Sequence, residues 1–131
     1  MNTRLFLYGL GIWLAATAAL RLGGQRLLHP ESAIRTLILF GVSFVLMAFL
    51  ARRLCRGLHV PLEAWPAGAI SLALPTLLLD PFSSAFFADV FPNIPASAAG
   101  IFGGWMLCCC AGALAGAIFF RRVTFFGRTS A

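Results

Sequence analysis

The sequence lacks lysine altogether, has only four acidic residues, and carries almost no charge inside its apolar stretches. Charged residues make up 11% of the 131 residues and hydrophobic residues 60%, whereas a typical soluble domain is about 25% charged. A soluble domain of this size cannot hide so much apolar surface from water. The composition therefore excludes an ordinary soluble fold and indicates that a lipid bilayer surrounds the apolar segments.

The sequence also lacks the common signatures of catalysis. It has no Cys-x-x-Cys pair, no Gly-rich phosphate loop and no pair of carboxylates within one apolar stretch. We therefore expect no enzymatic activity, no cofactor and no metal site.

Four stretches without charge define the predicted fold. Three of them are 16 residues long and the fourth is 31 residues long: Leu5 to Leu20, Thr36 to Ala51, Ala64 to Leu79 and Val90 to Phe120. A membrane-spanning helix needs about 20 apolar residues. Arg21, Arg35 and Arg52, which flank the first two stretches, extend them because their long side chains reach the interface. The sequence predicts one all-α domain over residues 1–131, a four-helix transmembrane bundle with spans at about 5–22, 34–51, 62–79 and 96–120.

The first stretch has a second interpretation as a cleaved signal peptide. Arg4 would precede its apolar core, and Ala16-Thr17-Ala18 would form the cleavage site. The apolar run continues past that site to Leu20, which favours a membrane span.

Two features refine the second half of the bundle. Pro75 lies within the third span and removes the hydrogen bond to the carbonyl of Ser71, which predicts a kink. The loop after this span has four phenylalanines, three prolines and no basic residue. It predicts a short interfacial helix at about 82–89 and then a turn, with Asn93 or Ser97 as the cap of the fourth span.

Small residues recur every four positions along the fourth span, a pattern that lets helices pack closely in lipid. The row consists of Gly100, Gly104, Cys108, Gly112 and Gly116. Either a neighbouring span of the same chain or a second copy of the protein would fill this row, and the sequence leaves both alternatives open.

Three consecutive cysteines, Cys108, Cys109 and Cys110, lie in the middle of the same span. Consecutive positions on a helix point about 100° apart, so these thiols cannot converge on one metal ion without ligands from another chain. We interpret them as packing residues, because buried cysteine behaves as a small hydrophobic residue. A metal-binding or redox function is the weaker alternative.

Four ionisable residues are expected to meet at the outer end of the bundle: Arg21, Arg35, Asp80 and Asp89. Arg21 and Asp80 each follow 16 uncharged residues in spans that run in the same direction, so they should lie at a similar depth. We expect an ion pair between them, with the other two residues nearby. Such a cluster is either a clamp between helix ends or a site for a ligand or ion.

The arginines also predict the orientation, because cytoplasmic loops carry an excess of basic residues. With the N-terminus inside, seven arginines lie inside, namely Arg4, Arg52, Arg53, Arg56, Arg121, Arg122 and Arg128. The three outside are Arg21, Arg26 and Arg35. We therefore predict a multi-pass protein of the bacterial inner membrane with both termini in the cytoplasm. The net charge of +6 points to anionic headgroups on the cytoplasmic side rather than to nucleic acid.

Several short motifs are distributed over the chain. They are Tyr8-Gly9 and Ile12-Trp13 in the first span, Leu20-Arg21-Leu22-Gly23-Gly24 at its end, Asp80 after the third span, Val90-Phe91-Pro92-Asn93 in the third loop, and Ala98-Ala99-Gly100-Ile101-Phe102-Gly103-Gly104-Trp105 at the start of the fourth span. Together they resemble an uncharacterised family of small four-span bacterial membrane proteins, a domain of unknown function. The resemblance implies four helices and no assigned activity.

Two function classes fit these observations. The first is a membrane protein without enzymatic activity that acts as an accessory subunit of a larger membrane protein or as a homo-oligomer. The alternative is a small transporter or channel that uses the outward-facing Arg/Asp cluster. Transport requires a cavity that reaches the charges, whereas an accessory subunit would be tightly packed and would expose its glycine row to lipid or to a partner.

The predicted orientation can be tested with a topology reporter. A reporter enzyme that is active only outside the cytoplasm should be active when inserted at residue 86 and inactive when fused to the C-terminus. An inactive reporter at residue 86 together with an active one at the C-terminus would contradict the orientation.

Overall fold

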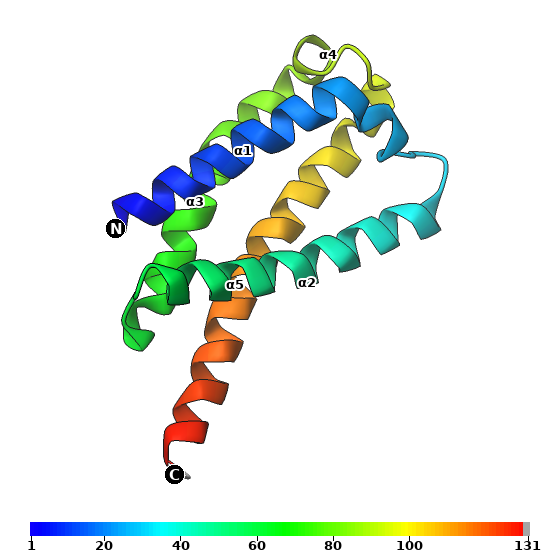
Figure 1. Ribbon diagram of the computed structural model, residues 1–131. Coiled ribbons are helices and arrows are strands. Elements are labelled where there is room, and N and C mark those ends of the chain that lie inside the picture. Colours follow the sequence, from blue (N-terminus) through cyan, green and yellow to red (C-terminus); the bar gives the residue numbers. More distant parts are fainter. Residues whose placement is uncertain (130–131) are drawn as a thin grey trace.

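The computed structural model describes residues 1–129, and within that part every regular element is a helix (Figure 1). Four long helices are α1 (Thr3–Gly23), α2 (Ala33–Gly57), α3 (Trp65–Ala85) and α5 (Ala99–Thr129). The shorter elements are α4 (Phe87–Val90) and the 3-10 turns η1 (Gly24–Arg26), η2 (Leu62–Ala64) and η3 (Ala96–Ala98). All four long helices are long and apolar enough to cross a membrane, so the predicted all-α, four-span fold is confirmed.

The helix starts follow from local capping. The side chain of Asn2 accepts a hydrogen bond from the N–H of Leu5 (3.2 Å) and starts α1. Ser32 accepts one from the N–H of Arg35 (3.4 Å) at the start of α2. Pro66 lies in the first turn of α3, where its missing N–H has no partner to lose.

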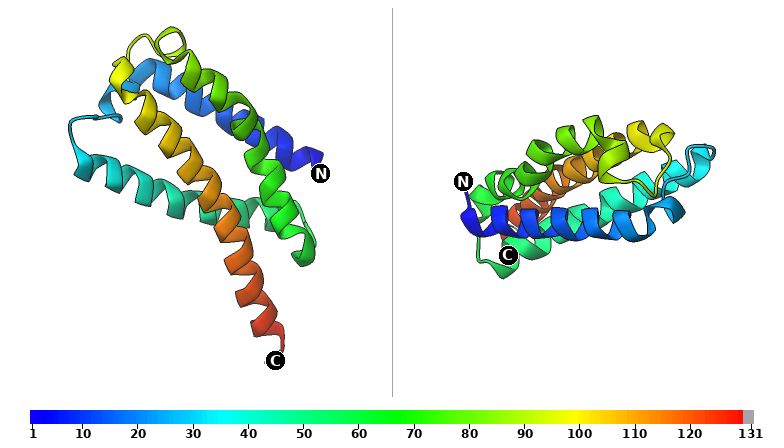
Figure 2. Two further views of the ribbon diagram at one scale, coloured as in Figure 1. Left: turned by 180° about the vertical axis from the view of Figure 1, so that it is seen from behind. Right: turned by 90° about the horizontal axis from the view of Figure 1, so that it is seen from above.

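The helices pack in the order α1, α3, α5, α2. Helix α5 contacts both α2 and α3 extensively, whereas α1 packs mainly on α3. Figures 1 and 2 show α1 and α2 separated from each other, with α5 crossing α2. The bundle is therefore a series of pairwise contacts, α1 with α3, α3 with α5 and α5 with α2, without extensive contact between α1 and α2.

Glycines permit the closest of these contacts. A methyl group added to Gly112 would lie 2.5 Å from the carbonyl oxygen of Phe44, and one added to Gly116 would lie 2.5 Å from the Cα of Ala48. Both neighbours belong to α2, so the backbones of α2 and α5 touch directly.

The rest of the predicted small-residue row follows the same face. A methyl group on Gly104 would lie 3.3 Å from the ring of Phe40, and the thiol of Cys108 donates to the carbonyl oxygen of Phe40 (3.4 Å). Gly100, in contrast, has open space beside it. A span of the same chain therefore occupies the row from Gly104 to Gly116.

Helix α3 runs through two prolines. Pro75 and Pro81 both lie inside the helix, which continues to Ala85. Figure 2 shows α3 changing direction in its middle part. The helix therefore continues six residues beyond residue 79, the predicted end of the third span, because neighbouring helices in a membrane protein stabilise a helix across a proline.

The third loop contains the predicted short helix, but it spans Phe87–Val90. Aromatic contacts hold this segment against α5: the ring centroids of Phe87, Phe91 and Phe102 lie 5.1 to 5.5 Å apart. The predicted cap, Asn93, donates instead to the carbonyl oxygen of Leu20 (2.9 Å) at the end of α1. It therefore ties the third loop to the first helix.

Substitution of Gly116 by alanine should destabilise the protein, because the added methyl group would collide with the backbone of Ala48. Overpacking of this kind costs about 1–3 kcal/mol. The matched substitution Gly100→Ala meets open space and should be neutral or slightly stabilising. Unfolding of both variants in mixed micelles of mild and denaturing detergent measures the difference. Equal stabilities would contradict the close α2–α5 contact.

Candidate functional site

A carboxylate lies inside the bundle. Asp80 of α3 is only 7% exposed. The indole Nε1 of Trp13 in α1 donates a hydrogen bond to its Oδ1 (2.7 Å). Its other oxygen, Oδ2, is buried and has no hydrogen-bond partner among the residues that the structure describes. The Oδ2 atom of this carboxylate can therefore accept a hydrogen bond or bind a cation.

The hydrogen bond also shows how deep the carboxylate lies. Trp13 is ten residues from each end of α1, which corresponds to about 15 Å of helix in either direction. The carboxylate of Asp80 therefore lies beside the middle of α1, although Asp80 itself is five residues from the C-terminal end of α3. Ionisable side chains buried between membrane-spanning helices are costly and are typical of functional sites.

The structure does not form the predicted ion pair between Arg21 and Asp80. Arg21 is eight residues beyond Trp13 on α1, or about 12 Å further along the helix. The side chain of Arg21 is exposed, and within residues 1–128 no ion pair joins it to Asp80. The prediction is wrong because equal numbers of uncharged residues do not place two side chains at equal depth when the helices are offset.

The other two members of the predicted cluster also lie elsewhere. Asp89 is exposed on α4. Nη1 of Arg35 lies 3.3 Å from Nε2 of His29, whose Nδ1 lies 3.0 Å from a carboxylate oxygen of Glu31. The pKa of Glu31 is lowered, first by a hydrogen bond from the backbone of Glu31 itself and second by the hydrogen bond to His29. The first loop therefore holds its own small polar group, separate from Asp80.

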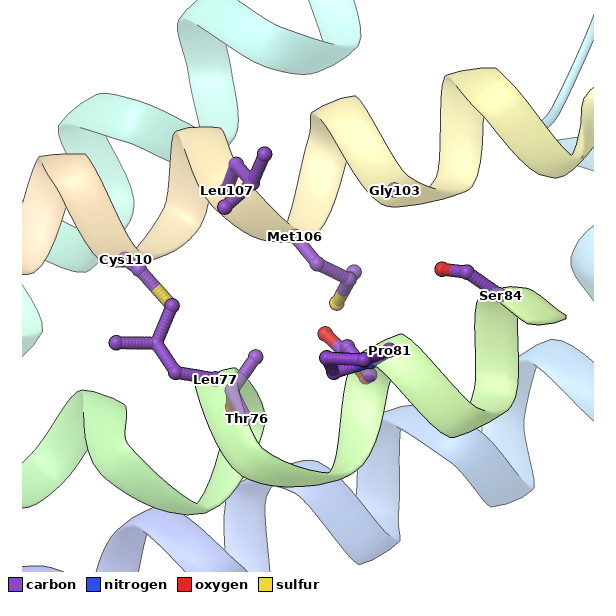
Figure 3. A pocket seen from close by; sticks show the side chains of 9 residues that line it. Thr76, Leu77, Pro81, Ser84, Gly103, Met106, Leu107 and Cys110 are labelled. Carbon is purple, nitrogen blue, oxygen red and sulfur yellow. The ribbon is translucent and has the colours of Figure 1, made fainter.

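Two cavities adjoin the buried carboxylate. One of about 180 Å³ lies between α3 and α5 and is lined by Asp80 itself. Figure 3 shows Met106 and Cys110 reaching from α5 toward α3 across the space bordered by Leu77 and Ser84. The second cavity, of about 210 Å³, has lining residues from all four long helices.

The two cavities are neighbours, because Thr76, Met106 and Cys110 line both of them. Trp13 lines only the four-helix cavity, whereas Asp80 lines only the one between α3 and α5. The Trp13–Asp80 hydrogen bond therefore stands between them.

A polar ridge on α3 adds to the site beyond what the sequence analysis identified. Thr76, Asp80 and Ser84 are four residues apart and share one face of the helix, and all three line the cavity between α3 and α5. The spacing of four residues between these side chains could have identified the ridge from the sequence. The hydrogen bond between Trp13 and Asp80 could not be predicted in this way, because the two residues are 67 positions apart and no local pattern connects them.

The three consecutive cysteines have different surroundings. Cys108 faces α2 through its contact with Phe40, whereas Cys109 and Cys110 line the four-helix cavity. The described residues contain no group of three His, Cys, Asp or Glu side chains able to hold a metal ion.

The polar side chains that line the cavity beside Asp80 carry oxygens. They are the carboxylate itself, whose Oδ2 has no partner among the described residues, and the hydroxyls of Thr76 and Ser84; Met106 and Cys110 add sulfur atoms. In addition, Pro81 has no N–H, so the carbonyl of Leu77 loses its partner within the helix. A lone carboxylate with hydroxyl groups in the same cavity suits a proton or a small monovalent cation.

The contact between Trp13 and Asp80 should appear in a double-mutant cycle. Trp13→Phe and Asp80→Asn should show a coupling of about 1.5–3 kcal/mol in unfolding experiments, the range for hydrogen bonds to charged groups. A parallel cycle with Arg21→Gln and Asp80→Asn should give a coupling near zero. The reverse order of couplings would show that Arg21, not Trp13, is the partner of Asp80.

Comparison with known families identifies the chain without assigning it an activity. The model of DUF5367, a family of unknown function, matches residues 27–123, which is 97 of the 131 residues. No curated protein and no solved structure matches the chain. The matched segment contains Asp80 and both cavity walls on α3 and α5, whereas Trp13 precedes it. The resemblance seen in the sequence is thereby confirmed, and the chain belongs to this family of unknown function.

Proposed function

We propose that this protein is a small membrane transporter without enzymatic activity, in which Asp80 binds a proton or a monovalent cation during transport. The observation that carries the proposal is the state of the carboxylate: it is buried, it is hydrogen-bonded through one oxygen to Trp13 and, within the described part of the chain, it has no partner at the other oxygen. A carboxylate so placed is costly unless it binds something.

The chemistry of the surroundings favours a cation over an anion. Asp80 brings a negative charge into the interior, and no arginine of the described residues lines either of the cavities beside it. The four-helix cavity is lined by the indoles of Trp13 and Trp105, and aromatic faces attract cations. A single carboxylate suits one positive charge better than a divalent ion.

The backbone next to Asp80 favours a binding site that can change position during transport. Pro75 and Pro81 both lie in α3, one on each side of Asp80. Each proline removes one hydrogen bond from the helix, so the segment that carries the carboxylate has fewer intrahelical bonds than an uninterrupted helix. Prolines within a membrane helix are tolerated where neighbouring helices and polar groups satisfy the freed backbone groups, so this segment can carry a site and remain helical.

A second candidate function is a homo-oligomer or an accessory subunit. The observation in its favour is a shallow groove on α1, where Gly11 and Ala15 are exposed beside Tyr8. A helix of another chain would fit against these small residues. Native mass measurement in detergent separates the two candidates, since a stable dimer or a co-purifying subunit supports the second.

Ion flux into lipid vesicles tests the transport proposal. Purified protein would be reconstituted with a pH-sensitive dye inside, and gradients of Na⁺, K⁺ or methylammonium would be applied in separate assays. At least one gradient should drive proton movement faster than in protein-free vesicles. Asp80→Asn should reduce the rate to that of protein-free vesicles, because the amide cannot exchange a proton or balance a cation.

Asp89→Asn is the matched control, because Asp89 is exposed outside the cavities. It should keep the wild-type rate. The proposal fails if Asp80→Asn transports as well as the wild type, or if none of the three gradients drives proton movement.

A further inference from the structure

A separate basic pocket lies at the opposite end of the molecule from the third loop, where α2 ends, α3 begins and the last turns of α5 pass. It encloses about 640 Å³. Its lining residues are Arg52, Arg56, Val60, Pro61, Leu62, Glu63, Trp65, Thr124 and Arg128. Three arginines therefore face one acidic residue, Glu63, which is exposed. The pocket attracts anions.

The side chain of Arg52 is held in place, but one of its hydrogen-bond donors has no partner. Its guanidinium lies 4.7 Å from the centroid of the Phe120 ring, which covers one face of the group. Its Nε is buried and has no hydrogen-bond partner among residues 1–128. A guanidinium held against an aromatic ring, with an unused donor, is suited to bind a phosphate or carboxylate.

The floor of the pocket is built by an ordered turn. The indole Nε1 of Trp65 donates to the carbonyl oxygen of Val60 (3.1 Å), and the N–H of Val60 donates to the carbonyl oxygen of Cys55 (2.9 Å). His59, between these contacts, has a positive φ of 53°. The loop that borders the arginines is therefore fixed before any ligand arrives.

The position of the pocket along α5 places it at the membrane surface. Helix α5 has 31 residues, or about 46 Å of helix, and exceeds the roughly 30 Å hydrocarbon core of a bilayer. Figure 1 shows its C-terminal part extending beyond the other helices. Thr124 and Arg128 belong to this part, so the pocket opens at the level of the lipid headgroups.

We propose that this pocket binds the phosphate group of an anionic phospholipid. Arg52, Arg56 and Arg128 would hold the phosphate oxygens, and Val60, Pro61 and Leu62 would border the glycerol and the start of an acyl chain. Basic pockets between helix ends at a membrane surface bind lipid headgroups in this way. The site does not depend on the function of Asp80.

Native mass spectrometry in a neutral detergent tests the proposal. Dioleoyl phosphatidylglycerol would be titrated against the wild-type protein, with dioleoyl phosphatidylcholine as the zwitterionic comparison. We expect retained phosphatidylglycerol at concentrations where phosphatidylcholine is not retained. Arg52→Gln should weaken the binding by about fivefold or more, the effect of one basic residue near a headgroup.

Arg56→Gln serves as a second variant, because this exposed side chain can be changed without disturbing the fold. Arg53→Gln is the matched control: Arg53 is exposed beside Arg52 but does not line the pocket. It should bind the lipid within about twofold of the wild type. Equal losses in the three variants, or no preference for phosphatidylglycerol, would overturn the proposal.

Competition with inorganic phosphate identifies the source of the phosphate group. Millimolar phosphate should not displace phosphatidylglycerol if the pocket also holds the glycerol and acyl chain. Displacement that depends on Arg52 would retain the phosphate site but overturn its assignment to a lipid.

Discussion

The close approach of α2 to α5 is the contact on which the arrangement of this bundle depends. Lipid supplies little drive for apolar helices to associate, so packing must come from backbones that touch. Gly112 and Gly116 allow this contact with α2. Helix α3 packs on α5 as well, and α1 is carried mainly by α3, where Gly9 lies directly against the carbonyl of Leu72. A disturbance at α5 would therefore reach every other helix.

The hydrogen bond between Trp13 and Asp80 contributes both to helix packing and to the chemistry of the candidate site. It connects α1 to α3 in a region where few other polar contacts do so. It also satisfies only one oxygen of the carboxylate, which leaves a charge that the described residues do not balance. Two other buried polar atoms, Nε of Arg52 and Oδ1 of Asn93, also lack a hydrogen-bond partner among the described residues, but neither belongs to a carboxylate. Trp105, in contrast, donates to Ser43 (2.7 Å). The unbalanced carboxylate is therefore the most distinctive chemical feature of the bundle.

The four spans could be predicted because an uncharged apolar stretch long enough to cross a bilayer is stable in lipid and costly to expose to water. Their ends could not, since a proline that would end a soluble helix is tolerated when neighbouring helices stabilise the chain, as in α3 at Pro81. Only one member of the candidate site, Asp80, could be predicted from the sequence. The sequence indicates Asp80 as an ionisable residue near membrane depth, but its charge spacing predicts Arg21 as the partner. Partner choice depends on helix offset and tilt, which charge spacing along the sequence does not contain.

The lining of the four-helix cavity has a consequence for how its size is maintained. The cavity is lined by Gly9 and Trp13 of α1 and by Leu46 and Met47 of α2, two helices without extensive contact with each other. A change in the separation of α1 and α2 would therefore change the volume of this cavity without breaking a major contact between the two helices. The tilt of these helices, rather than the rotamer of one side chain, would then determine how large a molecule the cavity can hold.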